Sequence, residues 1–128
     1  MLMIDYKTTL VFVYNADSGL FSSATDFIKK LATPDEYDCN LCMVTHGSLK
    51  MKSPWKDYLD TIPNKKLFLH RNEFLKDFPK NNNIDLPVIL AQNNDDINIL
   101  VHAEEINAVK TLEEMKTLLQ KAIHKTFN

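Results

Sequence analysis

Glycine and cysteine are scarce in this chain of 128 residues, which contains two of each. Two glycines are too few for a glycine-rich phosphate-binding loop, a collagen repeat or a flexible linker. Two cysteines cannot build the multi-bridge framework of a small secreted domain. A close pair of cysteines in such a chain is more typical of a reduced, catalytic or metal-binding site than of a permanent disulfide.

A long apolar segment is also missing. The longest candidate, Leu10 to Tyr14, is far below the roughly 18 residues of a membrane-spanning helix. The N-terminus has no basic region of the kind that begins a signal peptide, so we expect a cytoplasmic protein without a membrane partner. Fifteen basic and seventeen acidic residues give a net charge of −2, which argues against nucleic-acid binding by charge.

The composition itself is that of an ordinary globular protein, with 45% apolar and 25% charged residues. This length predicts one domain over residues 1–128, with enough apolar material for a proper core. The nucleophile elbow, the metalloprotease H-E-x-x-H motif and the dinucleotide-binding glycine fingerprint are all absent. The common catalytic motifs therefore assign no reaction.

Four short segments predict β-strands. The first, Thr8–Tyr14, is β-branched and aromatic without alternation, which is typical of a central strand buried on both faces. Asn93–Asp96 predicts a turn that joins the last two strands as an antiparallel hairpin. The other three predicted strands are Lys66–His70, Pro87–Ala91 and Ile97–His102.

Helical periodicity and capping signals predict the helices between and after these strands. Apolar residues recur every three or four positions from Leu20 to Leu31, which predicts the first helix. Thr111 and Glu114 form a capping box for the closing helix. Another helix is predicted to begin with Ser53 as its cap and Pro54 at its first position, and to end at Pro63. A brief helix is predicted over Glu73–Phe78, with Asn72 as its cap. The apolar stripe of the closing helix is Leu112, Met115, Leu119 and Ala122.

The segment Asp38–Gly47 fits either a strand or a short helix. In a strand, the side chains of Cys39 and Cys42 would point to opposite faces and could not bond. In a helix capped by Asp38, both thiols would lie near the positive end of the helix dipole, which favours the thiolate. We favour the helix, although the β-branched residues in the segment argue against it.

The order of the predicted elements is strand, helical region, strand, short helix, strand, strand and helix. This order resembles the thioredoxin-like superfamily over nearly the whole chain, with residues 35–62 as extra helical material in the first crossover. Leu86–Pro87 resembles the cis-proline position of that superfamily. The resemblance implies a single α/β domain with a central four-stranded mixed sheet flanked by helices. The runs Tyr14–Phe21, Cys39–Cys42 and Phe68–Phe74 further resemble a small bacterial branch of the superfamily.

The cysteine pair departs from the pattern of that superfamily. Thioredoxins and glutaredoxins carry CxxC or CxxS between the first strand and its helix, where this chain reads Ala16-Asp-Ser-Gly19. Here the pair follows the first predicted helix. No catalytic residue can therefore be transferred by position.

The leading functional hypothesis is thiol–disulfide exchange without a cofactor. Cys39 would attack a protein or small-thiol substrate, Cys42 would resolve the mixed disulfide, and His70 would assist proton transfer. In the alternative, the cysteines are structural and the protein is a non-catalytic binding module. A third possibility is a zinc site in which His46 joins the two cysteines and His70 or His102 supplies the fourth ligand, if the fold brings one of them near.

A ligand-binding crevice is also predicted from the order of the strands. Asn15, Asp17 and Ser18 follow the first strand, at the edge where open α/β sheets bind ligands. Pro87 enters its antiparallel strand at the same edge, and His70 closes the parallel second strand. We therefore expect these residues, together with Tyr14, to line one crevice. In the competing interpretation, Asp17 and Ser18 only cap a helix, and His70 pairs with a nearby carboxylate.

Overall fold

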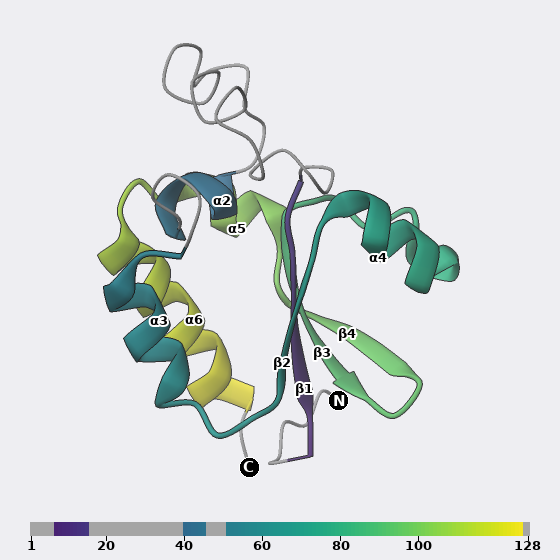
Figure 1. Ribbon diagram of the computed structural model, residues 1–128, viewed down its shortest axis with the longest axis horizontal. Helices are drawn as coiled ribbons and strands as arrows, with labels where there is room; N and C mark the ends of the chain where they lie inside the picture. The colour runs from purple at the N-terminus through teal and green to yellow at the C-terminus, as the bar shows by residue number, and fades with distance from the viewer. Residues whose placement is uncertain (1–6, 16–39, 46–50, 127–128) are drawn as a thin grey trace.

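The computed structural model describes residues 7–15, 40–45 and 51–126. Within these ranges the protein is α/β, with one four-stranded mixed sheet flanked by helices, as predicted (Figure 1). The strand order is β2-β1-β3-β4. The strands are β1 (Thr9–Val13), β2 (Lys66–Leu69), β3 (Val88–Asn93) and β4 (Asp96–Val101).

Strand directions follow the predictions. β1 pairs parallel with β2, with Val11 opposite Leu67, and antiparallel with β3, with Val11 opposite Leu90. β3 and β4 form the predicted antiparallel hairpin. Its turn places Asn94 at a φ of 56°, a left-handed conformation that asparagine tolerates better than most residues.

β1 is covered by side chains on both faces. Every residue from position 10 to 14 is apolar and buried. Alternate residues of a strand point to opposite faces. Leu10 and Phe12 therefore pack in one core cluster, and Val11 and Val13 pack in the other. The uninterrupted apolar run is thus explained by a central strand that both faces bury.

Helices cover the two faces of the sheet unequally (Figure 1). The first core cluster joins the sheet to four helices, and α2 packs against α5 and α6. The second cluster joins the other face to α4 through the fully buried Phe74. The helices are α2 (Asn40–Thr45), α3 (Ser53–Asp60), α4 (Arg71–Asp77), α5 (Ala103–Ala108) and α6 (Leu112–Thr126), and a 3-10 turn, η2, spans Pro79–Asn81.

The closing helix begins as the capping box predicts. The Thr111 hydroxyl accepts a hydrogen bond from the backbone N–H of Glu114 at 3.1 Å. The Glu114 carboxylate in turn accepts from the backbone N–H of Lys110 at 3.3 Å. Met115 and Leu119, both in the predicted stripe, are fully buried. The cap and the stripe together explain why this segment is a helix that packs on the sheet.

Two helices begin earlier than predicted. The cap of α3 is Lys52 and not Ser53, because the Lys52 carbonyl accepts the first helical hydrogen bonds, from Trp55 and Lys56. The cap of α4 is His70 and not Asn72, because the Glu73 carboxylate reaches back to the backbone N–H of His70. Helix α5 was not predicted, and the predicted helix over residues 20–31 lies outside the described residues.

Two further findings concern one peptide bond and the character of the helices. The peptide bond between Leu86 and Pro87 is cis. Among the helices that the structure describes, none has both the length and the apolar character needed to cross a membrane.

Candidate functional site

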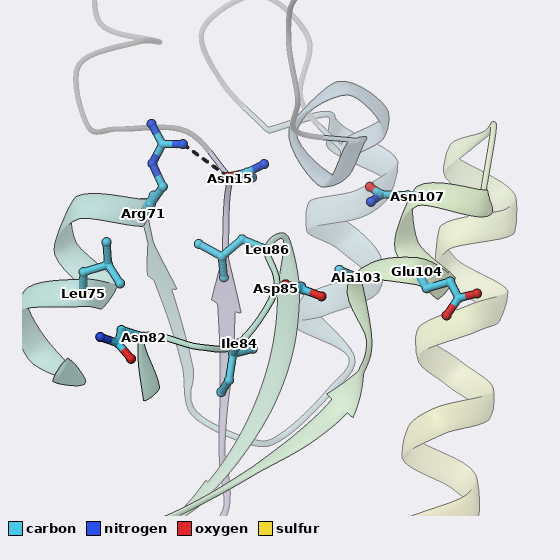
Figure 2. A pocket seen from close by; sticks show the side chains of 10 residues that line it. All are labelled: Asn15, Arg71, Leu75, Asn82, Ile84, Asp85, Leu86, Ala103, Glu104 and Asn107. Carbon is cyan, nitrogen blue, oxygen red and sulfur yellow. Dashed lines mark hydrogen bonds between the residues drawn. The ribbon is translucent and has the colours of Figure 1, made fainter. Parts of the chain in front are cut away.

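Three strands end at one edge of the sheet, and the fourth begins there. β3 is antiparallel to both β1 and β4, so β1, β2 and β4 all run toward this edge. A cavity of about 590 Å³ lies at the edge, and residues next to all four strands line it (Figure 2). The lining residues are Asn15, Arg71, Leu75, Asn82, Ile84, Asp85, Leu86, Ala103, Glu104 and Asn107. We call this cavity the carboxyl-edge pocket.

A hydrogen bond joins the residues that follow β1 and β2. The guanidinium of Arg71 donates from Nη1 to Oδ1 of Asn15 at 3.4 Å (Figure 2). Both side chains are half-buried. The bond is at the long end of the range for such contacts.

The wall between β3 and α4 is apolar. Ile84 and Leu86 pack against the core cluster that contains Phe74, so this part of the lining is anchored in the protein interior. Leu75 on α4 adds a side chain that is 41% exposed. The pocket thus combines a fixed apolar wall with polar groups around it, as ligand sites usually do.

The acidic groups lie on the side of the pocket toward α5. Asp85 stands in the loop before β3, and Glu104 stands in the first turn of α5 (Figure 2). A neighbouring cavity of about 320 Å³ shares both carboxylates and extends toward His102 and Ile99. Positive charge from Arg71 and negative charge from the two carboxylates therefore occupy opposite sides of the carboxyl-edge pocket.

His70 is held at the start of α4 and is not itself among the lining residues. Its Nδ1 lies 2.8 Å from Oε1 of Glu73, and its ring contacts the ring of Tyr14 with a centroid distance of 5.7 Å. The hydrogen bonds from the His70 backbone and side chain lower the pKa of Glu73. His70 thus pairs with a nearby carboxylate, as the competing interpretation expected. Its assistance in proton transfer stays a prediction.

Of the other predicted ligand-binding residues, Asn15 lines the pocket and Pro87 does not. Pro87 is buried at the start of β3, and the two residues before it, Asp85 and Leu86, face the pocket. Asp17 and Ser18 lie outside the described residues. Of the residues predicted for the crevice, Asn15 is the one in the pocket lining, and a crevice formed by the whole set stays a prediction.

The cysteine segment is described only in part. Residues 40–45 form helix α2, so over that range the helical interpretation is correct and the strand interpretation is wrong. The predicted cap, Asp38, lies outside the described residues. Cys42 belongs to this helix, and Cys39 and His46 lie outside the described residues. Across the ranges that the structure describes, no group of three or more histidine, cysteine, aspartate or glutamate side chains is placed to hold a metal ion.

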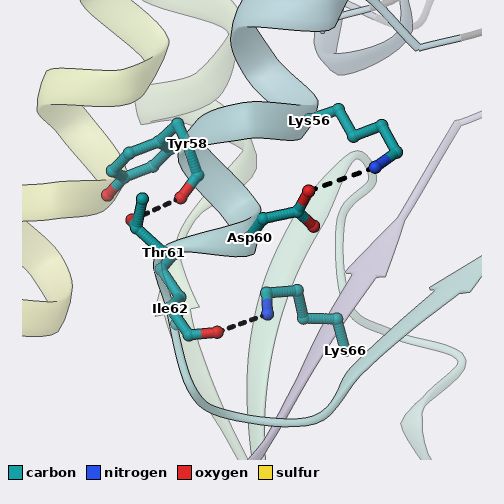
Figure 3. Close-up of polar contacts among 6 residues, drawn as sticks. All are labelled: Lys56, Tyr58, Asp60, Thr61, Ile62 and Lys66. Atoms are coloured by element: carbon teal, nitrogen blue, oxygen red, sulfur yellow. Dashed lines mark hydrogen bonds and ion pairs between the residues drawn. The ribbon is translucent and has the colours of Figure 1, made fainter.

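A third cavity, also of about 320 Å³, lies at the other end of the molecule, where the end of α3 and the loop after it face α6. There the ammonium group of Lys66 donates to the backbone carbonyls of Ile62, at 2.6 Å, and Asn64, at 3.0 Å. Figure 3 shows the Ile62 contact beside the ion pair between Lys56 and Asp60, whose atoms are 3.1 Å apart. Desolvation lowers the pKa of Lys66. These contacts stabilise the connection from α3 to β2. They explain the position of the Lys66 ammonium group, so no ligand has to be invoked for it.

Sequence reasoning missed the charged residues of the carboxyl-edge pocket. Arg71, Asp85 and Glu104 belong to no motif, and each looks like an ordinary surface residue in the sequence. A usable signal was their position, because each lies within three residues of a strand end at the same edge. Comparisons of the chain with protein-family models, with curated proteins and with solved structures found no match.

Proposed function

We propose that this protein is a thioredoxin-like binding module that takes a small polar ligand in the carboxyl-edge pocket. The observation that carries the proposal is the convergence of residues from all four strand ends on one cavity of about 590 Å³. Open α/β sheets bind ligands at this edge, and volumes of roughly 300–1,000 Å³ are typical of small-molecule sites.

The thioredoxin-like assignment is supported by the element order and the sheet. β1 and β2 are parallel and joined through helices, and the β3–β4 hairpin and the closing helix α6 follow. Pro87 enters β3 beside the carboxyl end of β1, since Val13 pairs with Val88. This is the arrangement of strands that the resemblance implies.

The binding proposal is tested by backbone-amide NMR of the ¹⁵N-labelled full chain. The probes are succinate, arginine, glucose, putrescine and adenosine monophosphate, each added alone. We expect at least one probe to shift the amides of Asn15, Arg71 and Glu104 together and saturably. No such shift with any probe contradicts the proposal.

A matched pair of variants then assigns the binding to the pocket. Arg71→Met removes a charged hydrogen-bond donor, and we expect it to weaken an anionic probe about tenfold, or ~1.4 kcal/mol. Lys76→Met removes an exposed cation of the same helix that does not line the pocket, and should leave the affinity within about twofold. Equal effects of the two variants would point to a general charge effect.

A second candidate function, thiol–disulfide exchange, is favoured by the helical conformation of residues 40–45. Residues three apart on a helix lie on one face, so a helix over the cysteine segment permits a bond between Cys39 and Cys42. The Cys39 thiolate would attack a substrate disulfide, form a mixed disulfide and release one substrate thiolate. Cys42 would then attack the Cys39 sulfur and release the second. The protein dithiol is thereby oxidised, and the substrate disulfide is reduced to two thiols.

This second candidate is tested by mass spectrometry of the reduced protein after exposure to bis(2-hydroxyethyl) disulfide. We expect an intramolecular disulfide, seen as the loss of two hydrogens, that dithiothreitol reverses. Cys42→Ser should stop at the mixed disulfide, whereas Cys39→Ser should not react at that rate. If both native thiols stay inert until denaturant is added, they are structural cysteines and the candidate fails.

A further inference from the structure

The carboxyl-edge pocket is electrically polarised. Arg71 lies on the α4 side, and Asp85 and Glu104 lie on the α5 side, with Leu86 between them (Figure 2). Arg71 is the positively charged side chain of the pocket lining, and the planar guanidinium group suits the two oxygens of a carboxylate. The two carboxylates offer only acceptors, which suit an ammonium group.

This distribution discriminates among ligand charges. A small anion at Arg71 would lie in a pocket that also holds two carboxylates, and a small cation at the carboxylates would share the pocket with Arg71. Charges closer than about 8 Å are not fully screened at physiological salt, so a singly charged ligand that lies this close to both sides meets repulsion as well as attraction. A ligand with one charge of each sign meets attraction at both sides.

We infer that the carboxyl-edge pocket selects a small zwitterion whose carboxylate lies at Arg71 and whose ammonium group lies at Asp85 and Glu104, with an apolar spacer against Leu86. The inference rests on the proposed binding function and names its ligand class. Charged hydrogen bonds determine the orientation, and the apolar wall of Ile84 and Leu86 accepts the methylene chain.

The test uses ω-amino acids from glycine to 6-aminohexanoate as probes. Backbone-amide NMR of the full chain measures the binding of each probe. Pentanoate and pentylamine are the matched probes that carry one charge each. We expect an optimum at one chain length, and affinity at that length at least about fivefold above that of either singly charged probe. The optimum reports the separation of the two charged sides.

Variants assign each charge to its partner. Arg71→Met should reduce the affinity of the best-binding ω-amino acid to that of pentylamine. The double variant Asp85→Asn and Glu104→Gln should reduce the affinity of the same ω-amino acid to that of pentanoate. Lys76→Met and Asp57→Asn, which change exposed charges outside the pocket, should leave the affinity within about twofold.

The outcomes separate the two proposals. Binding of pentanoate or pentylamine at the pocket amides as tightly as any ω-amino acid overturns the zwitterion inference and leaves the binding function in place. If an uncharged probe is the only one that shifts the pocket amides, the zwitterion inference is likewise overturned and the binding function stays in place. If no probe of either experiment shifts the amides of Asn15, Arg71 and Glu104, both proposals fail.

Discussion

His70 and Glu73 hold each other across the first turn of α4. The backbone N–H of His70 donates to Oε1 of Glu73 at 2.8 Å, and the Nδ1 atom of His70 lies 2.8 Å from the same oxygen. The sequence repeats the arrangement at α5, where the backbone N–H of His102 donates to Glu105 at 3.1 Å. Both capping boxes follow strands that end at the carboxyl-edge pocket, so both helices beside the pocket start at a defined residue.

Glu73→Gln should lower the free energy of unfolding by about 1 kcal/mol at neutral pH, because it removes the charged partner of this cap. The hydrogen bonds from His70 lower the pKa of Glu73 below its ordinary value of 4.5. The stabilisation is therefore complete above that value and is lost as the pH falls through the folded pKa. Urea denaturation at several pH values between 7 and 3 measures both effects.

The variant should also lose stability less steeply below about pH 4.5 than the wild type does. Glu113→Gln is the control, since Glu113 is an exposed residue whose carboxylate lies 3.7 Å from Lys116. We expect this surface change to alter stability by less than about 0.5 kcal/mol. Parallel pH profiles for wild type and Glu73→Gln would contradict the role assigned to the cap.

Phe74→Ala should destabilise the fold by about 3–5 kcal/mol, because it removes a fully buried ring and leaves a cavity between α4 and the sheet. Leu75→Ala is the matched change at the next position. Leu75 is 41% exposed, so its loss should cost less than about 1 kcal/mol. Chemical denaturation of the two variants under one set of conditions compares them, and similar losses would place the core of this face elsewhere.

Tyr14 should stay protonated in the folded protein well beyond the pH at which a free tyrosine ionises. Burial raises the pKa of its phenol above the ordinary value of 10.0. The phenolate absorbance of native Tyr14→Phe should therefore match that of the wild type up to about pH 11. In denaturant the variant should lose one of the four tyrosine signals of the chain. A lower native amplitude near pH 10 would show that Tyr14 is accessible.

The raised pKa of Tyr14 also makes the stability of the fold depend on pH. Its contribution is complete below the unfolded value and is lost as the pH rises toward the folded value, because the unfolded chain releases the phenolic proton first. Tyr14→Phe should therefore lose less stability between about pH 9 and pH 11 than the wild type does. Denaturant midpoints at these two pH values measure the difference.

Lys66→Met should change stability by no more than about 1 kcal/mol, although it removes two hydrogen bonds to backbone carbonyls. The reason is that two effects oppose each other. The lost hydrogen bonds destabilise the α3–β2 connection, whereas removal of a desolvated ammonium group stabilises the folded state. Thermal unfolding of Lys66→Met beside Lys65→Met, a change at an exposed neighbour, tests the balance. A loss of several kcal/mol would show that the hydrogen bonds dominate.

Much of the fold follows from local patterns. The apolar run from Leu10 to Tyr14 predicted a strand buried on both faces, and β1 is the strand with a core cluster on each side. The capping box at Thr111 and the turn at Asn94 were equally readable. These signals are reliable because neighbouring residues settle them, through side-chain alternation, hydrogen bonds to the local backbone and the φ angle of one residue.

Helix starts were predicted less well. The start of α4 depends on a carboxylate that reaches back three residues to His70, and Asn72 was an equally good cap by composition alone. Helix α5 has six residues, which is too short for a periodic apolar pattern to identify it. The competition among several possible caps is decided by packing of the whole helix against the sheet.

The sequence by itself therefore determined the strands, the hairpin and the closing helix, because the residues that make each of them are adjacent in the chain. Only the tertiary structure decided which polar residues meet. Asn15 and Arg71 are 56 residues apart, and their contact depends on β1 lying beside β2 in parallel. Asp85 and Glu104 join them only because β3 enters, and β4 leaves, at the same edge. Strand order is set by the packing of all the elements together, and so the pocket could not be assembled from local patterns.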